Sequence, residues 1–319
     1  MRKETDALGE MLLPDDVYYG IQTERNRQCL AITDDPLSAY PAFIKAVAQV
    51  KKACALTNKE IGALDAGKAD AIMRACDEMA DGAFNADFPL CIFRGSGTPF
   101  NMAANEVLAN RANEILTGYK GSDQVHPNTH VNMCQSSNDV YPTAENIVLY
   151  RETGRALEGV AALENSFARK SKEFGGVVRL GRTCLQDGVP MTLGQVFAGF
   201  HGVIRRSRER LEALREGFRV GVLGGTVIGT GLGVLPGYVE AVYPHLSAIV
   251  GFEMRLPDTP EGSPVSDAGL FDAMQNADGL LTLSGALKVL ACSAGKIAND
   301  FRLLSSGPRS GFGKIRLPA

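Results

Sequence analysis

Three short segments of the chain combine hydroxyl or amide side chains with flexible backbone or a helix start: Gly95-Ser96-Gly97-Thr98, Ser136-Ser137-Asn138 and Gly181-Arg182-Thr183. Neutral donors of this kind hold a carboxylate through several hydrogen bonds, without a permanent cation at every contact. Segments between long helices also carry function more often than the helices that hold them. The three segments therefore indicate a binding site for an acid.

The stretch CQSSNDVYPTAENI, residues 134–147, places four small polar side chains directly before a helical run. One interpretation is a capped helix start, because Ser, Asn and Asp are preferred caps and Pro is tolerated in a first turn. Another is an anion site, because the first N–H groups of a helix are unpaired and carry partial positive charge. The stretch by itself leaves both interpretations open.

Other motifs favour structural roles. The segment 224–237, GGTVIGTGLGVLPG, lacks the lysine of a P-loop and no strand pattern precedes it, so we expect a turn between two helices. Cys184 has no identifiable histidine partner and is expected to be an inert buried thiol. His126 and His130 are separated by Pro127 and have no thiolate or carboxylate nearby, which predicts a surface turn and no metal site.

The dominant hydrophobic period is helical. Apolar residues recur at three-, four- and seven-residue steps in 143–170 and 191–219, and we expect further helices in 42–61, 66–80 and 268–304. Thr192 and Gln195 form the pattern of a capping box at the start of the second of these. Strand-like alternation with hairpin turns is nearly absent. The pattern predicts an all-α protein of long helices packed as a bundle.

Composition narrows the function classes. The net charge of −3 over 319 residues gives no basic footprint for nucleic acid. No apolar run approaches the roughly 18 residues of a membrane span, and the N-terminus MRKETDALGE lacks the apolar region of a secretory signal. Seven cysteines without CxxC spacing are typical of free thiols in a reducing compartment. We therefore expect a soluble cytoplasmic protein that binds neither nucleic acid nor membrane.

Five ordered blocks carry a resemblance that spans essentially the whole chain: RGSGTPFNMAANEVLANRA, HPNTHVNMCQSSNDVYPTA, GRTCLQDGVPMTLGQ, GGTVIGTGLG and NDFRLLSSGPRSGFGKIRLP. The first three resemble the active-site regions of the aspartase/fumarase superfamily. This resemblance implies an all-helical subunit of three domains in a homotetramer, with each active site shared between subunits. Residues 1–138 would form the N-terminal domain and 139–319 an incomplete central bundle, with the C-terminal domain absent.

The resemblance also assigns roles to residues. Ser136, Ser137 and Asn138 would hold a substrate carboxylate at a helix start, Thr98 would share it, and Thr183 would face the other end of the substrate. Ser96 and Cys184 are weaker candidates for the same site. The superfamily eliminates an amine or water from a succinyl-type substrate through a doubly charged aci-carboxylate, and no cofactor or metal is expected.

Three features depart from the family pattern. Family members carry a mobile loop with a general-base serine and a substrate-binding lysine, and this sequence stops at Ala319 just before it. We therefore expect the 319-residue chain to be inactive as given. Cys184 replaces a histidine found in many members, which weakens the case for fumarase. Ser137 stands where aspartases often have threonine, which points the other way.

Other stretches of the sequence, including DDVYYGIQT and VKKACALTNKEI, are closer to aspartate ammonia-lyases than to class II fumarases. The preferred expectation is reversible elimination of ammonia from L-aspartate to give fumarate. Class II fumarase, which interconverts malate and fumarate, is the alternative. A non-catalytic structural relative is a second alternative, although such a protein need not keep the site residues.

Overall fold

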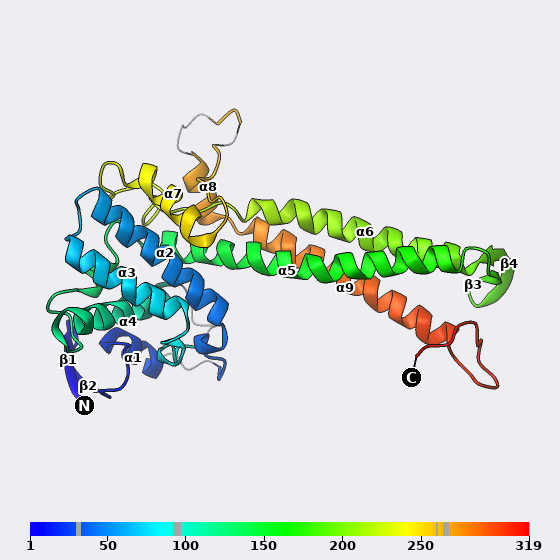
Figure 1. Ribbon diagram of the computed structural model, residues 1–319, viewed down its shortest axis with the longest axis horizontal. Coiled ribbons are helices and arrows are strands. Elements are labelled where there is room, and N and C mark those ends of the chain that lie inside the picture. The colour runs from blue at the N-terminus through cyan, green and yellow to red at the C-terminus, as the bar shows by residue number, and fades with distance from the viewer. Residues whose placement is uncertain (30–32, 92–96, 260, 264–267, 319) are drawn as a thin grey trace. The chain divides into compact units, whose positions relative to one another are not determined.

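The computed structural model describes residues 1–29, 33–91, 97–259, 261–263 and 268–318. These form two compact units, each made of two stretches of chain (Figure 1). The first unit comprises Met1–Leu149 and Phe218–Asn276, and the second comprises Tyr150–Gly217 and Ala277–Ala319. The units group the chain by packing rather than by sequence order, so the domain boundary expected between residues 138 and 139 stays a prediction.

The first unit is mostly helical, with one small hairpin. Its strands pair antiparallel, with Arg2 opposite Leu13. Its elements in chain order are β1 (Arg2–Asp6), β2 (Gly9–Leu13), α1 (Ile21–Cys29), η1 (Leu37–Ala39), α2 (Pro41–Glu60), α3 (Ala66–Ala80), η2 (Asn85–Asp87), α4 (Gly97–Thr117), the π-helix η3 (Pro127–Val131), the first turns of α5 (Ser137–Glu173), α7 (Tyr238–Val250) and α8 (Ala268–Gln275).

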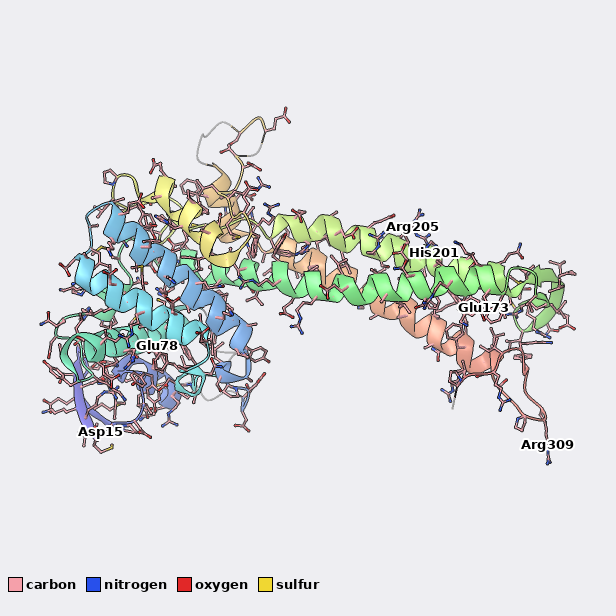
Figure 2. The ribbon with its side chains drawn as sticks, viewed as in Figure 1. Asp15, Glu78, Glu173, His201, Arg205 and Arg309 are labelled. Carbon is pink, nitrogen blue, oxygen red and sulfur yellow. The ribbon has the colours of Figure 1, made fainter. Side chains whose placement is uncertain are left out.

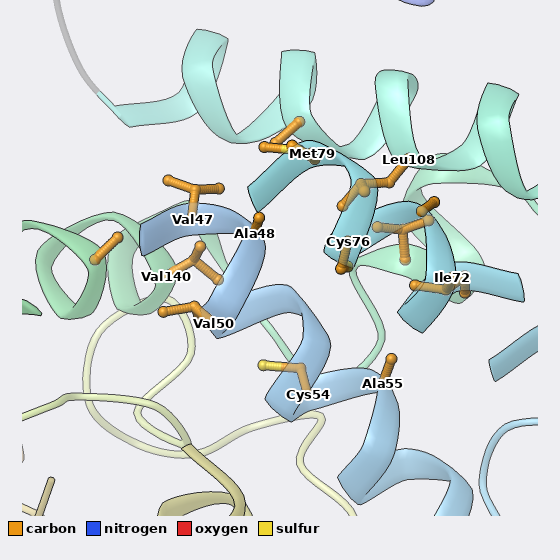
Figure 3. Packing of buried hydrophobic residues seen from close by; sticks show 14 of the residues in the cluster. Val47, Ala48, Val50, Cys54, Ala55, Ile72, Cys76, Met79, Leu108 and Val140 are labelled. Carbon is orange, nitrogen blue, oxygen red and sulfur yellow. The ribbon is translucent and has the colours of Figure 1, made fainter. Parts of the chain in front are cut away.

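Local chemistry fixes the starts of these helices. Pro41 opens α2 at a position where its missing N–H is not needed. Asp65 caps α3 by accepting a hydrogen bond from the Lys68 backbone N–H at 3.0 Å. α2, α3 and α4 then bury a common core in which Val50, Cys54, Ile72 and Leu108 are nearly or fully inaccessible (Figure 3). Alanines at many facing positions let these helices approach closely.

The second unit is built on long helices. Its elements are the remainder of α5, β3 (Val178–Thr183), β4 (Gln186–Thr192), α6 (Leu193–Gly217) and α9 (Asp278–Leu304). Aromatic side chains of these helices, including Phe167, Phe197 and Phe301, form its core. Glu164 of α5 accepts a hydrogen bond from Arg208 of α6 at 2.6 Å and lies 3.5 Å from His201, which Figure 2 labels on α6.

The capping box predicted at the start of α6 is confirmed. Thr192 Oγ1 accepts from the Gln195 N–H at 3.1 Å, and Gln195 Oε1 accepts from the Thr192 N–H at 2.9 Å. The all-α prediction is also confirmed, because helices make up nearly all of the regular structure among the described residues.

Two sequence expectations were wrong in detail. The segments 2–13 and 178–192 form two antiparallel hairpins, although hairpins were expected to be nearly absent. The pairing within each hairpin is local, and alternation over such short strands is hard to distinguish from loop composition. The expected helix 268–304 is two helices, α8 and α9, separated at Asn276 and Ala277.

One helix among the described residues, α9, is long and apolar enough to cross a membrane by length and composition alone. Only 17% of its most apolar 18-residue window is buried. The sequence predicted an apolar helix here but no membrane span, because Gly, Ser, Thr and Lys interrupt its apolar residues. A helix that packs in a bundle meets the same two criteria.

The close approach of α5 and α6 in the second unit generates a prediction. A Cβ on Gly194 would lie 2.5 Å from the Ser171 carbonyl oxygen and 2.7 Å from the Gly175 Cα. Because these are backbone atoms that cannot rotate away, Gly194→Ala should lower the free energy of unfolding by about 1–3 kcal/mol. Calorimetric unfolding of the purified variant measures this change.

Gly159→Ala is the matched control, since a Cβ on Gly159 of α5 has no neighbour within 4 Å. Alanine should stabilise that helix by about 0.5–1 kcal/mol. Equal effects of the two substitutions would contradict the packing assigned to Gly194.

Candidate functional site

The start of α5 is a capped helix N-terminus. Ser136 Oγ accepts a hydrogen bond from the Asn138 backbone N–H at 3.2 Å. In return, Asp139 Oδ1 accepts from the Ser136 backbone N–H at 2.8 Å, which completes a reciprocal capping box. The capping interpretation of this stretch is confirmed. The Ser137 hydroxyl proton and one N–H of the Asn138 amide have no acceptor in this cap, so a cap does not exclude an anion site here.

Asp139 ties this helix start to the glycine-rich segment 221–237. Its side chain is fully buried, and its Oδ2 accepts from the Thr226 backbone N–H at 3.0 Å. Burial raises the pKa of the Asp139 carboxyl to about 7, although backbone N–H groups around it act in the opposite direction. With both oxygens engaged and no access to solvent, Asp139 is a structural carboxylate rather than a base for a bound substrate.

The glycine-rich segment forms successive turns before α7, as the sequence predicted. Thr226 has a φ of 57° and Gly224 a φ of 93°, so the backbone there turns through the left-handed region. Asn138 Nδ2 donates to the Val227 carbonyl oxygen at 2.7 Å. One N–H of the Asn138 amide therefore anchors the turn, and its second N–H and its oxygen are left for other partners.

Ser137 is linked to α4 through a buried asparagine. Asn101 Nδ2 donates to Ser137 Oγ at 3.0 Å and to Asn132 Oδ1 at 3.1 Å. Thr98 is exposed and lies one helical turn before Asn101, on the same side of α4. The starts of the two helices also meet directly, because a Cβ on Gly97 would lie 2.6 Å from the Tyr141 ring. The structure thus brings the first and second predicted segments together.

A buried lysine lies behind these amides. Lys51 of α2 has no exposed surface, and its Nζ donates to Asn132 Oδ1 at 2.9 Å and to Gln135 Oε1 at 2.8 Å. Burial lowers the pKa of the Lys51 ammonium to about 8, because desolvation disfavours its charge. Asp139 and Lys51 are not joined by an ion pair among the described residues.

Sequence reasoning missed several of these groups: Lys51, Asn101, Asn132, Gln135 and the structural role of Asp139. One signal was available, because Ser136 and Asp139 have the spacing of a capping box. Nothing local marks Lys51, which is one of two adjacent lysines on an otherwise ordinary helix.

Thr183 and Cys184 lie in the second unit, at the tip of the β3–β4 hairpin, and both are exposed. The expectation of a buried Cys184 thiol was therefore wrong, because the residue lies in a turn at the surface. Thr183 pairs with Gln186, so Cys184 and Leu185 form the two-residue turn. Their φ angles of 49° and 62° are unusual for residues with a side chain and fit a type I′ turn. Thr183 is thus presented on a strained, solvent-facing tip. Ser96, the remaining candidate, lies outside the described residues.

The histidine pair forms a turn, as expected. His126 Nδ1 accepts from the backbone N–H groups of Asn128 and Thr129, both at 3.2 Å, and His130 Nδ1 accepts from the His126 N–H. A search of the described residues finds no group of His, Cys, Asp and Glu arranged to hold a metal ion.

Chemically, the helix start offers hydrogen-bond donors and no titratable group of its own that faces solvent. Hydroxyls from Ser136 and Ser137, with the first N–H groups of α5, suit an anion. The same donors would stabilise negative charge that develops on a bound carboxylate during a reaction.

Comparisons with known proteins agree with this geometry. A lyase family model matches residues 9–319. The aspartate ammonia-lyase of Helicobacter pylori (strain J99) is 42% identical over 320 residues, covering 100% of this chain and 66% of the relative. The class II fumarate hydratase of Ralstonia nicotianae is 42% identical over 320 residues, covering 99% of this chain and 67% of the relative. The chain spans about two thirds of the length of these curated relatives.

A solved structure is equally similar. The fumarate lyase:delta crystallin of Brucella melitensis, determined with bound cobalt, matches with a TM-score of 0.92 at 43% identity. The match covers 100% of this chain and 67% of that chain. The relative named aspartate ammonia-lyase and the relative named fumarate hydratase have the same sequence identity to this chain. Sequence identity alone therefore does not choose between the two substrates.

The buried carboxylate generates a prediction about pH. Because the pKa of Asp139 is raised in the folded state, its contribution to stability is complete below about pH 4 and is lost as the pH rises through 7. Between pH 4.5 and 7.5 the unfolding free energy of the wild type should therefore fall by about 3 kcal/mol relative to Asp139→Asn. Urea unfolding at a series of pH values measures this difference.

Asp123→Asn, which removes an exposed carboxylate in the same unit, controls for the loss of one negative charge. Parallel stability profiles for the wild type and Asp139→Asn would contradict the raised pKa.

Proposed function

The chain belongs to the aspartase/fumarase superfamily of lyases, and from this premise we propose that the whole protein eliminates ammonia from L-aspartate to give fumarate. The observation that carries the proposal is the start of α5, where Ser136 and Ser137 stand at a helix N-terminus that is capped and still offers donors. Such a terminus suits the carboxylate beside which the substrate loses its proton.

The proposed reaction begins when a base removes a proton from the carbon next to this carboxylate. The pair of electrons moves into the carboxylate, which becomes a doubly charged aci-carboxylate. Collapse of this intermediate expels ammonia and leaves the double bond of fumarate. Donors already aimed at the carboxylate lower the barrier, and one well-placed donor contributes about 3–4 kcal/mol.

In this scheme Ser136, Ser137 and Thr98 stabilise the developing charge, and the second N–H of the Asn138 amide helps to hold the carboxylate. Thr183, on its exposed hairpin tip, would meet the other end of a substrate bound to a neighbouring subunit. The general base is proposed to be a serine of a loop that follows the residues of this chain, as the family resemblance implies. None of the described residues at the helix start is a suitable base, since Asp139 is buried and doubly engaged.

We further propose a cytoplasmic homotetramer assembled through the long helices of the second unit. Apolar side chains on α9 are exposed, with Leu281 at 73% and Val289 at 47% of their full accessibility. Packing against other helices would cover such a surface, which a soluble single chain rarely exposes. Seven free cysteines fit a reducing compartment.

A class II fumarase activity is the second candidate, because a relative with that name has the same 42% identity as the aspartate ammonia-lyase. Cys184 favours the ammonia-lyase, since a thiol cannot become a cation as imidazole can. The two activities differ in the leaving group that the site must hydrogen-bond, an amine in one and a hydroxyl in the other. One or two side chains can decide this.

The deciding experiment supplies the full-length gene product with fumarate and ammonia in water and identifies the product by NMR. Formation of aspartate supports the proposed function. Formation of malate alone would replace it with the fumarase reaction, and absence of any turnover would contradict both.

The role of Ser137 has its own test. Ser137→Ala removes one hydroxyl donor from the helix start, and kcat/KM should fall by about 100-fold. The helical content should not change, because the Ser136 and Asp139 cap is intact. Ser166→Ala, which changes a partly exposed serine of the same helix, is the matched control and should retain activity. Equal kcat/KM for the wild type and Ser137→Ala would exclude the hydroxyl from the reaction.

A further inference from the structure

Lys51 is a buried charge without a carboxylate partner in contact. It is fully buried in α2, and both hydrogen bonds described for its ammonium go to side-chain amide oxygens, those of Asn132 and Gln135. Lysines are almost never fully buried unless they are paired with an acidic group. The titratable groups nearest in influence are the Cys54 thiol, the Asp139 carboxyl and the Cys76 thiol, and burial raises the pKa of both thiols, which keeps them neutral. The position therefore carries a cost in stability that its packing does not explain.

The ammonium dictates how two amides are turned. Because it has protons to donate and no lone pair, only the oxygens of Asn132 and Gln135 can face it. The nitrogen atoms of the two amides must then point away. Asn132 Nδ2 donates to the Gln135 carbonyl oxygen at 3.2 Å, and Gln135 Nε2 donates to the Val131 and Met133 carbonyl oxygens, both at 3.0 Å. Every donor of this pair has a partner in the fixed orientation.

This orientation is passed on to Asn101. The Asn132 oxygen, held toward Lys51, also accepts a hydrogen bond from Asn101 Nδ2 at 3.1 Å. A carbonyl oxygen can accept but not donate, so the Asn101 amide must turn its nitrogen toward Asn132. The Asn101 oxygen is then left without a hydrogen-bond partner among the described residues, although its side chain is buried. An isolated asparagine would not choose this orientation, and the lysine explains it.

Asn101 in turn sets the direction of the Ser137 hydroxyl. The same Nδ2 group donates its second proton to Ser137 Oγ at 3.0 Å. Since Ser137 Oγ accepts from Asn101, its own proton is directed elsewhere, toward what lies in front of the helix start. A chain of hydrogen bonds thus leads from the Lys51 ammonium through Asn132 and Asn101 to Ser137. The Ser137 hydroxyl is left to donate its proton to a group in front of the helix start.

We propose that Lys51 is a positioning residue that acts through Asn132 and Asn101 to make the Ser137 hydroxyl a donor to a bound carboxylate. This inference rests on the proposed carboxylate site at the start of α5. It adds to that site a lysine that does not contact the substrate. This lysine determines whether the Ser137 hydroxyl donates or accepts a hydrogen bond at the substrate. A neutral side chain at position 51 would leave the asparagine amides free to turn. The Ser137 hydroxyl could then donate its hydrogen bond to the Asn101 oxygen instead of to the substrate.

Succinate, an unreactive dicarboxylate, is the probe. Its dissociation constant is measured by isothermal titration calorimetry with the full-length protein, for the wild type, Lys51→Met, Ser137→Ala and the double variant. Each single substitution should weaken binding by about tenfold. The double variant should bind about as weakly as Ser137→Ala alone, because Lys51 acts through that hydroxyl.

Lys52→Met is the matched control. Lys52 is the next residue of α2, pairs with Asp77 near the surface, and should leave the affinity for succinate unchanged. A double variant about 100-fold weaker than the wild type would mean that the two effects are independent, and it would overturn the proposal in favour of a structural or long-range electrostatic role.

A second measurement applies to the wild type and remains available if Lys51→Met does not fold. A high-resolution crystal structure with succinate should place a carboxylate oxygen within about 3 Å of Ser137 Oγ, with the Asn101 nitrogen still facing the serine. An Asn101 oxygen facing Ser137, or a wild type that binds no succinate, would overturn the inference. Failure of the proposed function would instead show as absence of turnover while succinate binding and its dependence on Lys51 persist.

Discussion

The first turn of α5 depends on one buried carboxylate. Asp139 accepts the backbone N–H of Ser136 on one side and that of Thr226 on the other, so it joins the start of a 37-residue helix to a segment almost ninety positions later. A helix terminus has N–H groups that need partners, and a buried one cannot obtain them from water. By accepting the N–H groups of Ser136 and Thr226, Asp139 holds the start of α5 beside the glycine-rich segment.

The same region holds an unusual amount of buried polarity. Lys51, Asn101 and Asp139 lie among the alanines and aliphatic side chains of α2, α4 and α5, where an apolar residue would be the more stable choice. The pKa of Asp139 rises and that of Lys51 falls because both are desolvated. Such groups are tolerated when a hydrogen-bond network supplies their partners. Here the network of Lys51 and Asn101 ends at the hydroxyl of Ser137, a residue of the proposed carboxylate site. The buried polar groups lower the stability of this core, and their hydrogen bonds orient the side chains at the start of α5.

The two compact units differ in how complete their cores are. In the first, small side chains at 46, 48, 53, 69, 71 and 75 allow close helix packing, and exposed large apolar residues lie almost entirely outside the helices, mainly in the β1–β2 hairpin and in the segment 227–235. In the second, a cluster of phenylalanines packs α5, α6 and α9 together, while other apolar positions of α9 stay exposed. The helices of the first unit are therefore largely covered, whereas α9 of the second unit exposes apolar side chains that association could bury. This contrast agrees with the proposed assembly.

The sequence by itself determined the helical class, the α6 capping box, the cap at Ser136 and the three segments that carry hydroxyls, because each depends on residues within one or two turns of each other. It missed the hairpin that presents Thr183, since short strands leave a weak period. It also could not find Lys51, Asn101 and Asn132. Those residues are separated by 31 to 81 positions, and only their hydrogen bonds bring them together. Tertiary structure decided them because a buried donor must find an acceptor wherever the folded chain supplies one.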